Sequence, residues 1–201
     1  MLDLGTTFIA AAEREPNAKA IVDGALALTY GEWFERIRCL AGGLDGIGLK
    51  PGDRVAVMLR NNWQMATLHW ACQLAGITVT PLNWRVRADE LDYFVGDADA
   101  KAIFFEAVSA DAVNAAASVN SLPQVSIDGA LNGALEFSDL VNSPPAPEQS
   151  KADAEDMSLT PYTSGTTAPG TGLPLRPRVD AAAPLARGAS AERLRVGNGR
   201  S

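Results

Sequence analysis

The chain has few of the residues that build disulfide frameworks, metal sites and membrane spans. Its 201 residues include one histidine and two cysteines, Cys39 and Cys72, which exclude a disulfide scaffold and show no metal-ligand spacing. No apolar run approaches the roughly 18 residues that cross a bilayer, so we expect no transmembrane segment. The N-terminus carries an acid and no basic residue, so we expect no secretory signal and a reducing, cytoplasmic setting.

Positive charge is also scarce. The net charge of −7 argues against binding to the phosphate backbone of nucleic acids as the main function. Hydrophobic residues make up 47% of the chain and charged residues 20%, which excludes wholesale disorder. The length is sufficient for one or two domains with a sizeable core.

The composition changes at position 168. All aromatic residues lie before it, and residues 1–167 carry 11 basic against 22 acidic side chains, whereas residues 168–201 carry six arginines against Asp180 and Glu192. The tail has almost no large apolar residues, so it cannot offset the entropy lost on ordering, about 1–2 kcal/mol per residue. We therefore predict that residues 168–201 form an unrelated tail rich in Arg, Pro, Gly and Ala, which is disordered.

The first 142 residues predict alternating helices and strands. Helices are expected at residues 4–15, from 29 to about 46, at 63–75, at 88–95 and after 107, and strands at 20–22, 25–28, 54–60, 77–80, 101–105 and 124–127. Thr29 and Glu32 form a capping-box pattern at the start of the second helix, and Asp23-Gly24 is a favoured hairpin turn. Strands that alternate with helices over short connections predict an α/β fold, a mostly parallel sheet flanked by helices.

A group of hydroxyl side chains surrounds a glycine after a further expected strand, residues 157–162. The segment reads Tyr162-Thr163-Ser164-Gly165-Thr166-Thr167. Glycine lets backbone N–H groups turn toward an anion, and hydroxyls donate further hydrogen bonds, so this pattern favours a phosphate-binding loop. The alternative is a polar surface turn, because Ser, Thr and Gly gather in loops for local reasons.

Several short motifs resemble, in order, those of the adenylate-forming superfamily, which contains acyl-CoA synthetases, luciferases and peptide-synthetase adenylation domains. They are Leu28-Thr29-Tyr30-Gly31-Glu32, Lys50-Pro51-Gly52-Asp53-Arg54-Val55-Ala56-Val57, Asn61-Asn62, Leu74-Ala75-Gly76-Ile77, Pro81-Leu82-Asn83-Trp84-Arg85, Glu90-Leu91 and Ala100-Lys101-Ala102-Ile103. The segment at 162–167 resembles the family's loop Y-T-S-G-T-T-G-x-P-K-G. The resemblance covers about residues 10–167.

This resemblance implies a domain organisation. Residues 1–142 are expected to form an α/β subdomain similar to the first subdomain of the adenylate-forming fold. Residues 143–156 are expected to be a Pro-rich linker or surface loop, because three prolines fall within four positions. Residues 157–167 would supply a strand and the phosphate-binding loop, and residues 168–201 the tail.

The resemblance also implies an activity, that of an ATP-dependent carboxylic acid:CoA ligase such as those of fatty acid metabolism. In that family a carboxylate attacks the α-phosphate of ATP to give an acyl-adenylate and pyrophosphate, with Mg²⁺ bound, and the thiol of coenzyme A displaces AMP. Thr163, Ser164, Gly165, Thr166 and Thr167 match the residues that donate to the β- and γ-phosphates. No catalytic residue and no metal ligand is assigned, and the acid substrate is not identified.

Two departures from the family pattern support a second hypothesis. Thr171 occupies the position of the loop lysine, and the later family motifs, including the ribose-binding Asp and the catalytic lysine, have no counterpart. Under this hypothesis the chain is the product of a truncated or frameshifted reading frame, and is either inactive or a residual binding module. Translating the DNA beyond Thr167 in the other two frames distinguishes a frameshift, which would recover the later family motifs, from a genuine alternative tail.

Other candidate residues have simpler interpretations. No Walker motif is present. His69, Cys39 and Cys72 are expected to be buried packing residues on helices. The tryptophans Trp63, Trp70 and Trp84 are expected to pack in the core or between subdomains, and the acidic residues Asp97, Asp99, Asp153, Glu155 and Asp156 are expected to be solvated charges.

Overall fold

The computed structural model describes residues 4–129, 131, 133–148, 158–163 and 171–172. Its helices are α1 (Leu4–Arg14), α2 (Tyr30–Gly46), α3 (Trp63–Ala75), α4 (Ala88–Asp97), α5 (Ala110–Ala115) and α6 (Phe137–Leu140), with a 3-10 turn at Ala107–Ser109. Its strands are β1 (Lys19–Asp23), β2 (Leu26–Thr29), β3 (Arg54–Met58), β4 (Thr78–Pro81), β5 (Ala102–Phe105), β6 (Gln124–Ser126), β7 (Leu135–Glu136), β8 (Tyr162–Thr163) and β9 (Thr171–Gly172).

The predicted parallel sheet is confirmed. Five strands lie in the order β4-β3-β5-β6-β7, and every neighbouring pair is parallel. The chain runs from β3 outward to β4 through α3, and then returns through α4 to β5 on the other side of β3. The strand order therefore reverses at β3, and ligands of open α/β sheets bind beyond the carboxyl ends of the strands at such a point.

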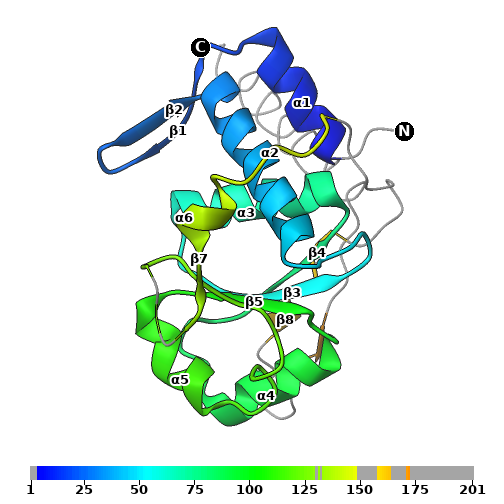
Figure 1. The fold of residues 1–201 in the computed structure, drawn as a ribbon, viewed down its shortest axis with the longest axis vertical. Helices are drawn as coiled ribbons and strands as arrows, with labels where there is room; N and C mark the ends of the chain where they lie inside the picture. The colour runs from blue at the N-terminus through cyan, green and yellow to red at the C-terminus, as the bar shows by residue number, and fades with distance from the viewer. Residues whose placement is uncertain (1–3, 130, 132, 149–157, 164–170, 173–201) are drawn as a thin grey trace, which may run out of the picture.

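Helices cover both faces of the sheet. Helices α1, α2, α3 and α6 lie on one face and α4 and α5 on the other, as Figure 1 shows. The side chains of β3 alternate between these layers, because successive residues of a strand point to opposite faces: Val55 and Val57 pack under α2 and α3, whereas Ala56 and Met58 pack under α4 and α5. Both faces of the central strands are buried, which explains their continuous apolar runs.

The capping box predicted for α2 is present, and α3 is capped at both ends. The Thr29 hydroxyl accepts from the Glu32 backbone N–H at 3.3 Å, and the Glu32 carboxylate accepts from the Thr29 N–H at 2.8 Å, which completes the capping box of α2. Asn62 caps α3 by accepting from the Met65 N–H at 2.9 Å. Gly76 ends α3 with φ 71°, a left-handed conformation that favours glycine.

The Pro-rich segment lies along α2 over its described part, residues 143–148. The Ala146 N–H donates to the Arg38 carbonyl at 2.9 Å, and Arg38 Nε donates back to the Ala146 carbonyl at 3.0 Å. Arg38 also forms an ion pair with Glu148, with a separation of 3.2 Å. These contacts make residues 143–148 a surface loop held against the body, while residues 149–157 lie outside the described part of the chain.

Three elements were not predicted: β7, α6 and β9, the last of which lies in the segment 168–201 that we expected to be disordered. β7 and α6 follow the short strand β6, and their two and four residues carry too little periodicity to be recognised in the sequence. None of the helices in the described residues is long and apolar enough to cross a membrane.

Candidate functional site

The hydroxyl-rich segment begins in a short antiparallel ladder. β8 pairs with β9, with Tyr162 opposite Gly172 and Thr163 opposite Thr171. The residues on both sides of 164–170 are therefore joined by backbone pairing. The other residues predicted to bind phosphate, Ser164, Gly165, Thr166 and Thr167, lie outside the described residues, as does the tail beyond residue 172.

The chain reaches this ladder along the free edge of β4. Leu159 forms a parallel bridge with Val79, in which the Val79 N–H donates to the Ser158 carbonyl at 3.1 Å and the Thr160 N–H donates to the Val79 carbonyl at 2.9 Å. Residues 158–160 thus run in the same direction as β4, and the segment after them leaves at the carboxyl edge of the sheet. This is the edge where ligands bind in open α/β folds.

Tyr162 joins the ladder to α4. Its hydroxyl donates to Asp97 Oδ2 at 2.5 Å, and its ring packs on Phe94 with the centroids 4.7 Å apart. Burial first, and then the hydrogen bond to Asp97, raise the pKa of Tyr162. Our expectation for Asp97 was incomplete: its side chain is exposed, but it also accepts this hydrogen bond, which brings together residues 65 positions apart.

A buried carboxylate lies at the carboxyl ends of β3 and β5. Glu106 is 1% exposed and accepts from the Arg60 backbone N–H at 2.5 Å, from Arg60 Nε at 2.6 Å and from Asn62 Nδ2 at 3.1 Å. Asn62 is also the N-cap of α3, so one carboxylate fixes two strand ends and a helix start. Sequence reasoning missed this cluster; an acid directly after the apolar strand β5 was the available indication.

Two buried hydroxyl oxygens near the site have no hydrogen-bond partner among the described residues. They belong to Thr80 and Thr160, which are each one position beyond the pair formed by Val79 and Leu159. Both side chains therefore point to the face of the sheet that α4 covers. An unpaired buried hydroxyl costs about 1–3 kcal/mol, so these two groups fit a site that receives a further polar partner.

The cysteines show no sign of reactivity. Cys72 is fully buried, and burial raises the pKa of its thiol, as expected for a packing residue. Cys39 is half-buried, and burial and the nearby Glu35 raise the pKa of its thiol.

His69 is half-buried beside Trp70, with the ring centroids 5.6 Å apart, so it lies at the margin of the core instead of inside it. Within the described residues, no group of His, Cys, Asp and Glu could hold a metal ion.

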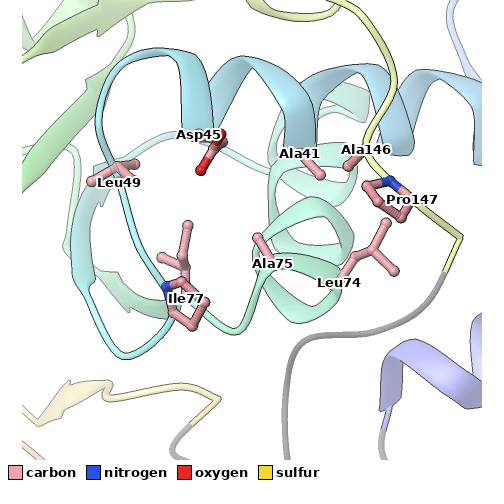
Figure 2. Close-up of a pocket in the computed structure, with 9 residues that line it drawn as sticks. Ala41, Asp45, Leu49, Leu74, Ala75, Ile77, Ala146 and Pro147 are labelled. Carbon is pink, nitrogen blue, oxygen red and sulfur yellow. The ribbon is translucent and has the colours of Figure 1, made fainter.

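The described part of the body contains a small cavity and wider open grooves, one of which, of about 400 Å³, lies between β1 and α3. Figure 2 shows a cavity of about 10 Å³ between the ends of α2 and α3, where Leu74 and Ala75 lie close to Ala146 and Pro147. It has room for about one water molecule and is largely apolar, so we regard it as a packing defect. A wider open groove of about 360 Å³ follows β4, and there the Arg85 guanidinium lies 3.8 Å from the centroid of the Trp84 ring.

Comparison with known proteins gives one consistent result. The family model described as AMP-binding enzyme matches residues 8–175. A feruloyl-CoA synthase from an Amycolatopsis species is 34% identical over 164 residues, which are 82% of this chain and 31% of that protein. A 2-succinylbenzoate–CoA ligase from Bacillus licheniformis is 28% identical over 158 residues, 78% of this chain and 30% of that protein. The chain thus spans about a third of the length of these relatives.

Solved structures agree on the fold. An anthranilate CoA ligase in complex with anthranoyl-AMP superposes with a TM-score of 0.80 at 18% identity, over 87% of this chain and 35% of that one. A benzoate CoA ligase from Burkholderia xenovorans superposes with a TM-score of 0.76 at 18% identity, over 88% of this chain and 35% of that one. Both comparisons place the chain's fold in the first third or so of a ligase fold's length.

The family match ends farther along the chain than the motif resemblance did. It includes residues 168–175, where Thr171-Gly172-Leu173-Pro174 has the Thr-Gly-x-Pro order that precedes the lysine in the family loop. By that order Leu175, and not Thr171, stands where the lysine is expected. The residue at this position is uncharged in either alignment.

Proposed function

The chain belongs to the AMP-binding enzyme family, and from that premise we propose that it takes part in ATP-dependent ligation of a carboxylic acid to coenzyme A. The observation that carries the proposal is that the family match covers 8–175 and that matched relatives are named as CoA ligases. The reaction class is the one described above: carboxylate attack on the α-phosphate releases pyrophosphate, and the thiol of coenzyme A then displaces AMP from the acyl group.

Within this reaction we assign triphosphate binding to the segment from Thr163 to Thr167. Hydroxyls and backbone N–H groups there would donate to the β- and γ-phosphates, which would hold the leaving pyrophosphate in place. The approach along the β4 edge and the β8–β9 ladder support this assignment, because they bring the segment out at the carboxyl edge of the sheet. The unpaired hydroxyls of Thr80 and Thr160 also fit a polar ligand nearby.

The Mg²⁺ ion that we include in the proposal would accompany the nucleotide. No metal-binding group of acidic, His or Cys side chains occurs in the part of the chain that the structure describes. Mg²⁺ in nucleotide sites is held largely by phosphate oxygens and water, so the fit of this chain to Mg²⁺ depends on the triphosphate. We also propose a cytoplasmic setting, which the free thiols of Cys39 and Cys72 support.

A second candidate function is nucleotide binding without turnover. It is favoured by the uncharged residue at the lysine position, whichever of Thr171 and Leu175 occupies it. Losing a charge-assisted contact costs about 1.5–3 kcal/mol, or roughly 10- to 150-fold in phosphate affinity.

Two measurements on the 201-residue chain test the proposal and separate the candidates. Calorimetric titration with MgATP should detect binding that the double substitution Thr163→Ala, Ser164→Ala removes and that Ser138→Ala, which removes an exposed hydroxyl on α6, leaves intact. ATP–pyrophosphate exchange should be followed with ferulic, benzoic and long-chain fatty acids. Acid-dependent exchange would establish ligase chemistry in this chain, and MgATP binding without exchange would establish the second candidate. No MgATP binding would contradict the proposed function.

A further inference from the structure

Within the described residues, the β8–β9 ladder has few attachments to the rest of the molecule. β8 and β9 contain two residues each, and they pair with one another and not with the five-stranded sheet. The bridge at Leu159 lies before the ladder and fixes only the incoming chain. The position of the ladder therefore depends on a contact made by the ladder itself.

Tyr162 makes that contact with two residues of one helix. Phe94 and Asp97 are in the last turn of α4, and both meet the Tyr162 side chain: the ring packs at a centroid distance of 4.7 Å with an interplanar angle of 52°, and the hydroxyl donates at 2.5 Å. The contact with Phe94 restrains the position of the Tyr162 ring. The hydrogen bond to Asp97 restrains the orientation of the side chain, because it fixes where the hydroxyl lies. Helix α4 is itself fixed, because Leu91 and Val95 are buried against the sheet.

We propose that Tyr162 is a positioning residue for the triphosphate: by binding Asp97 and Phe94 of α4, it fixes the ladder from which the phosphate-binding segment extends. The proposal rests on the proposed function, because it concerns the same segment. It adds a role for α4, a helix that carries none of the predicted phosphate ligands.

The test compares substitutions that remove one contact at a time in the full chain. Tyr162→Phe keeps the ring and removes the hydroxyl, Asp97→Ala removes the acceptor, and Asp97→Asn retains an oxygen that can accept. Tyr93→Phe is the matched control, because it removes a tyrosine hydroxyl from a 42% exposed side chain on the same helix. Affinities for MgATP and for inorganic triphosphate with Mg²⁺ are measured by calorimetry, and unfolding by thermal melting.

We expect Tyr162→Phe and Asp97→Ala to weaken both ligands about tenfold, which corresponds to about 1.4 kcal/mol, the size of one hydrogen bond to a charged group. Asp97→Asn should restore binding to within about twofold, and Tyr93→Phe should leave it unchanged. The melting temperature should stay close to that of the unchanged chain in all four variants. Unchanged affinity in Tyr162→Phe would overturn the proposal, and so would equal weakening by Asp97→Asn and Asp97→Ala.

Failure of the proposed function is recognised separately. If the unchanged chain binds neither ligand, the proposed function is contradicted, and with it the role of Tyr162 toward the triphosphate. Hydrogen exchange then tests the structural half of the proposal: amides at 162–163 and 171–172 should exchange faster in Tyr162→Phe than in Tyr93→Phe. Equal exchange in the two variants would contradict the anchor as well.

Discussion

The five-stranded sheet and the edge segment at 158–163 are held in very different ways. All four residues of β5 are buried with no measurable exposure, and β5 pairs with β3 along its whole length and with β6 from Ile103 to Phe105. The edge segment is attached more sparsely, by two backbone hydrogen bonds to Val79 and by the side chain of Tyr162. The Gln73 amide also donates to the Ser158 carbonyl at 3.3 Å, and Leu159 packs against the core. The stability of the molecule therefore resides in the sheet and its helices, and the proposed phosphate site lies on a lightly attached margin.

This difference separates two kinds of substitution. A change in the sheet should remove folding and ligand binding together, whereas a change at the edge should weaken binding while the body remains folded. Regions that bind ligands are commonly drawn from the less stable part of a structure, since they must admit and release another molecule. Substitutions in each region can break or sharpen this contrast.

The largest effect is expected in the central strand. Phe104 is fully buried between α2, α3 and the neighbouring strands, and Phe104→Ala should lower the free energy of unfolding by about 3–5 kcal/mol. MgATP binding should be lost with the fold. Urea denaturation measures the change, and Val108→Ala, at a side chain that is 51% exposed, should change it by no more than about 0.5 kcal/mol. Similar losses of unfolding free energy in the two variants would contradict the conclusion that the stability of the molecule resides in the sheet.

The next effect concerns the buried carboxylate that joins strand ends to α3. Glu106→Ala leaves the Arg60 N–H and the Asn62 amide without their acceptor, and should lower the free energy of unfolding by about 1.5–3 kcal/mol. Arg60→Ala should cost less, because the Arg60 side chain is 60% exposed and water can replace part of its ion pair. Glu106→Gln should lie between the two. Equal costs for Glu106→Ala and Arg60→Ala in denaturation would refute the central role of the carboxylate.

Much of the fold was predictable because its signals are local. The capping box at Thr29, the cap at Asn62 and the left-handed glycine at 76 each act within a few residues, and the apolar stripe with Phe34, Ile37 and Leu44 gives the buried face of α2. The parallel sheet followed from strands that alternate with helices over short connections, whereas the order of its strands was not predicted. The helix α4 was predicted to end at residue 95 and continues to Asp97, an error of the usual size at helix ends.

The candidate site was less predictable because its contacts are long-range. The loop motif at 162–167 could be recognised from composition, but nothing local to Asp97 indicates that it accepts from Tyr162, and nothing local to Glu106 indicates Arg60 as its partner. Such pairs are created when the sheet brings strand ends together. The attachment of residues 143–148 to α2 was hidden for the same reason, since Pro-rich sequence is typical of both linkers and packed loops.

A smaller effect tests that attachment. A Cβ placed on Gly42 would lie 2.0 Å from the Pro144 carbonyl oxygen, so Gly42→Ala forces the segment away and should cost about 1–3 kcal/mol. Gly46→Ala on the same helix meets no atom within 4 Å, and should be neutral or stabilising by up to about 1 kcal/mol. Denaturation of both variants measures the difference. A gain in stability from Gly42→Ala would show that residues 143–148 do not pack on α2 as described.

The smallest effect is the acid response of the α2 cap, which lies in the body and should not reach the edge segment. Hydrogen bonds from the Thr29 backbone N–H and then the Thr29 hydroxyl hold the pKa of Glu32 below its ordinary value of 4.5. A carboxyl whose pKa is lower in the folded state stabilises that state above the unfolded pKa, and this contribution is lost as the pH falls through the folded pKa.

Glu32→Gln keeps a capping-box acceptor and does not titrate. The stability advantage of the unchanged chain over Glu32→Gln should therefore be constant near pH 7 and shrink below about pH 4.5, with MgATP affinity at pH 7 the same in both. Thermal melts across this range measure it. Thr29→Val should reduce this pH-dependent loss of stability without abolishing it, because the backbone N–H still donates. A stability advantage over Glu32→Gln that grows as the solution is acidified would have the wrong sign and would refute the assignment to Glu32.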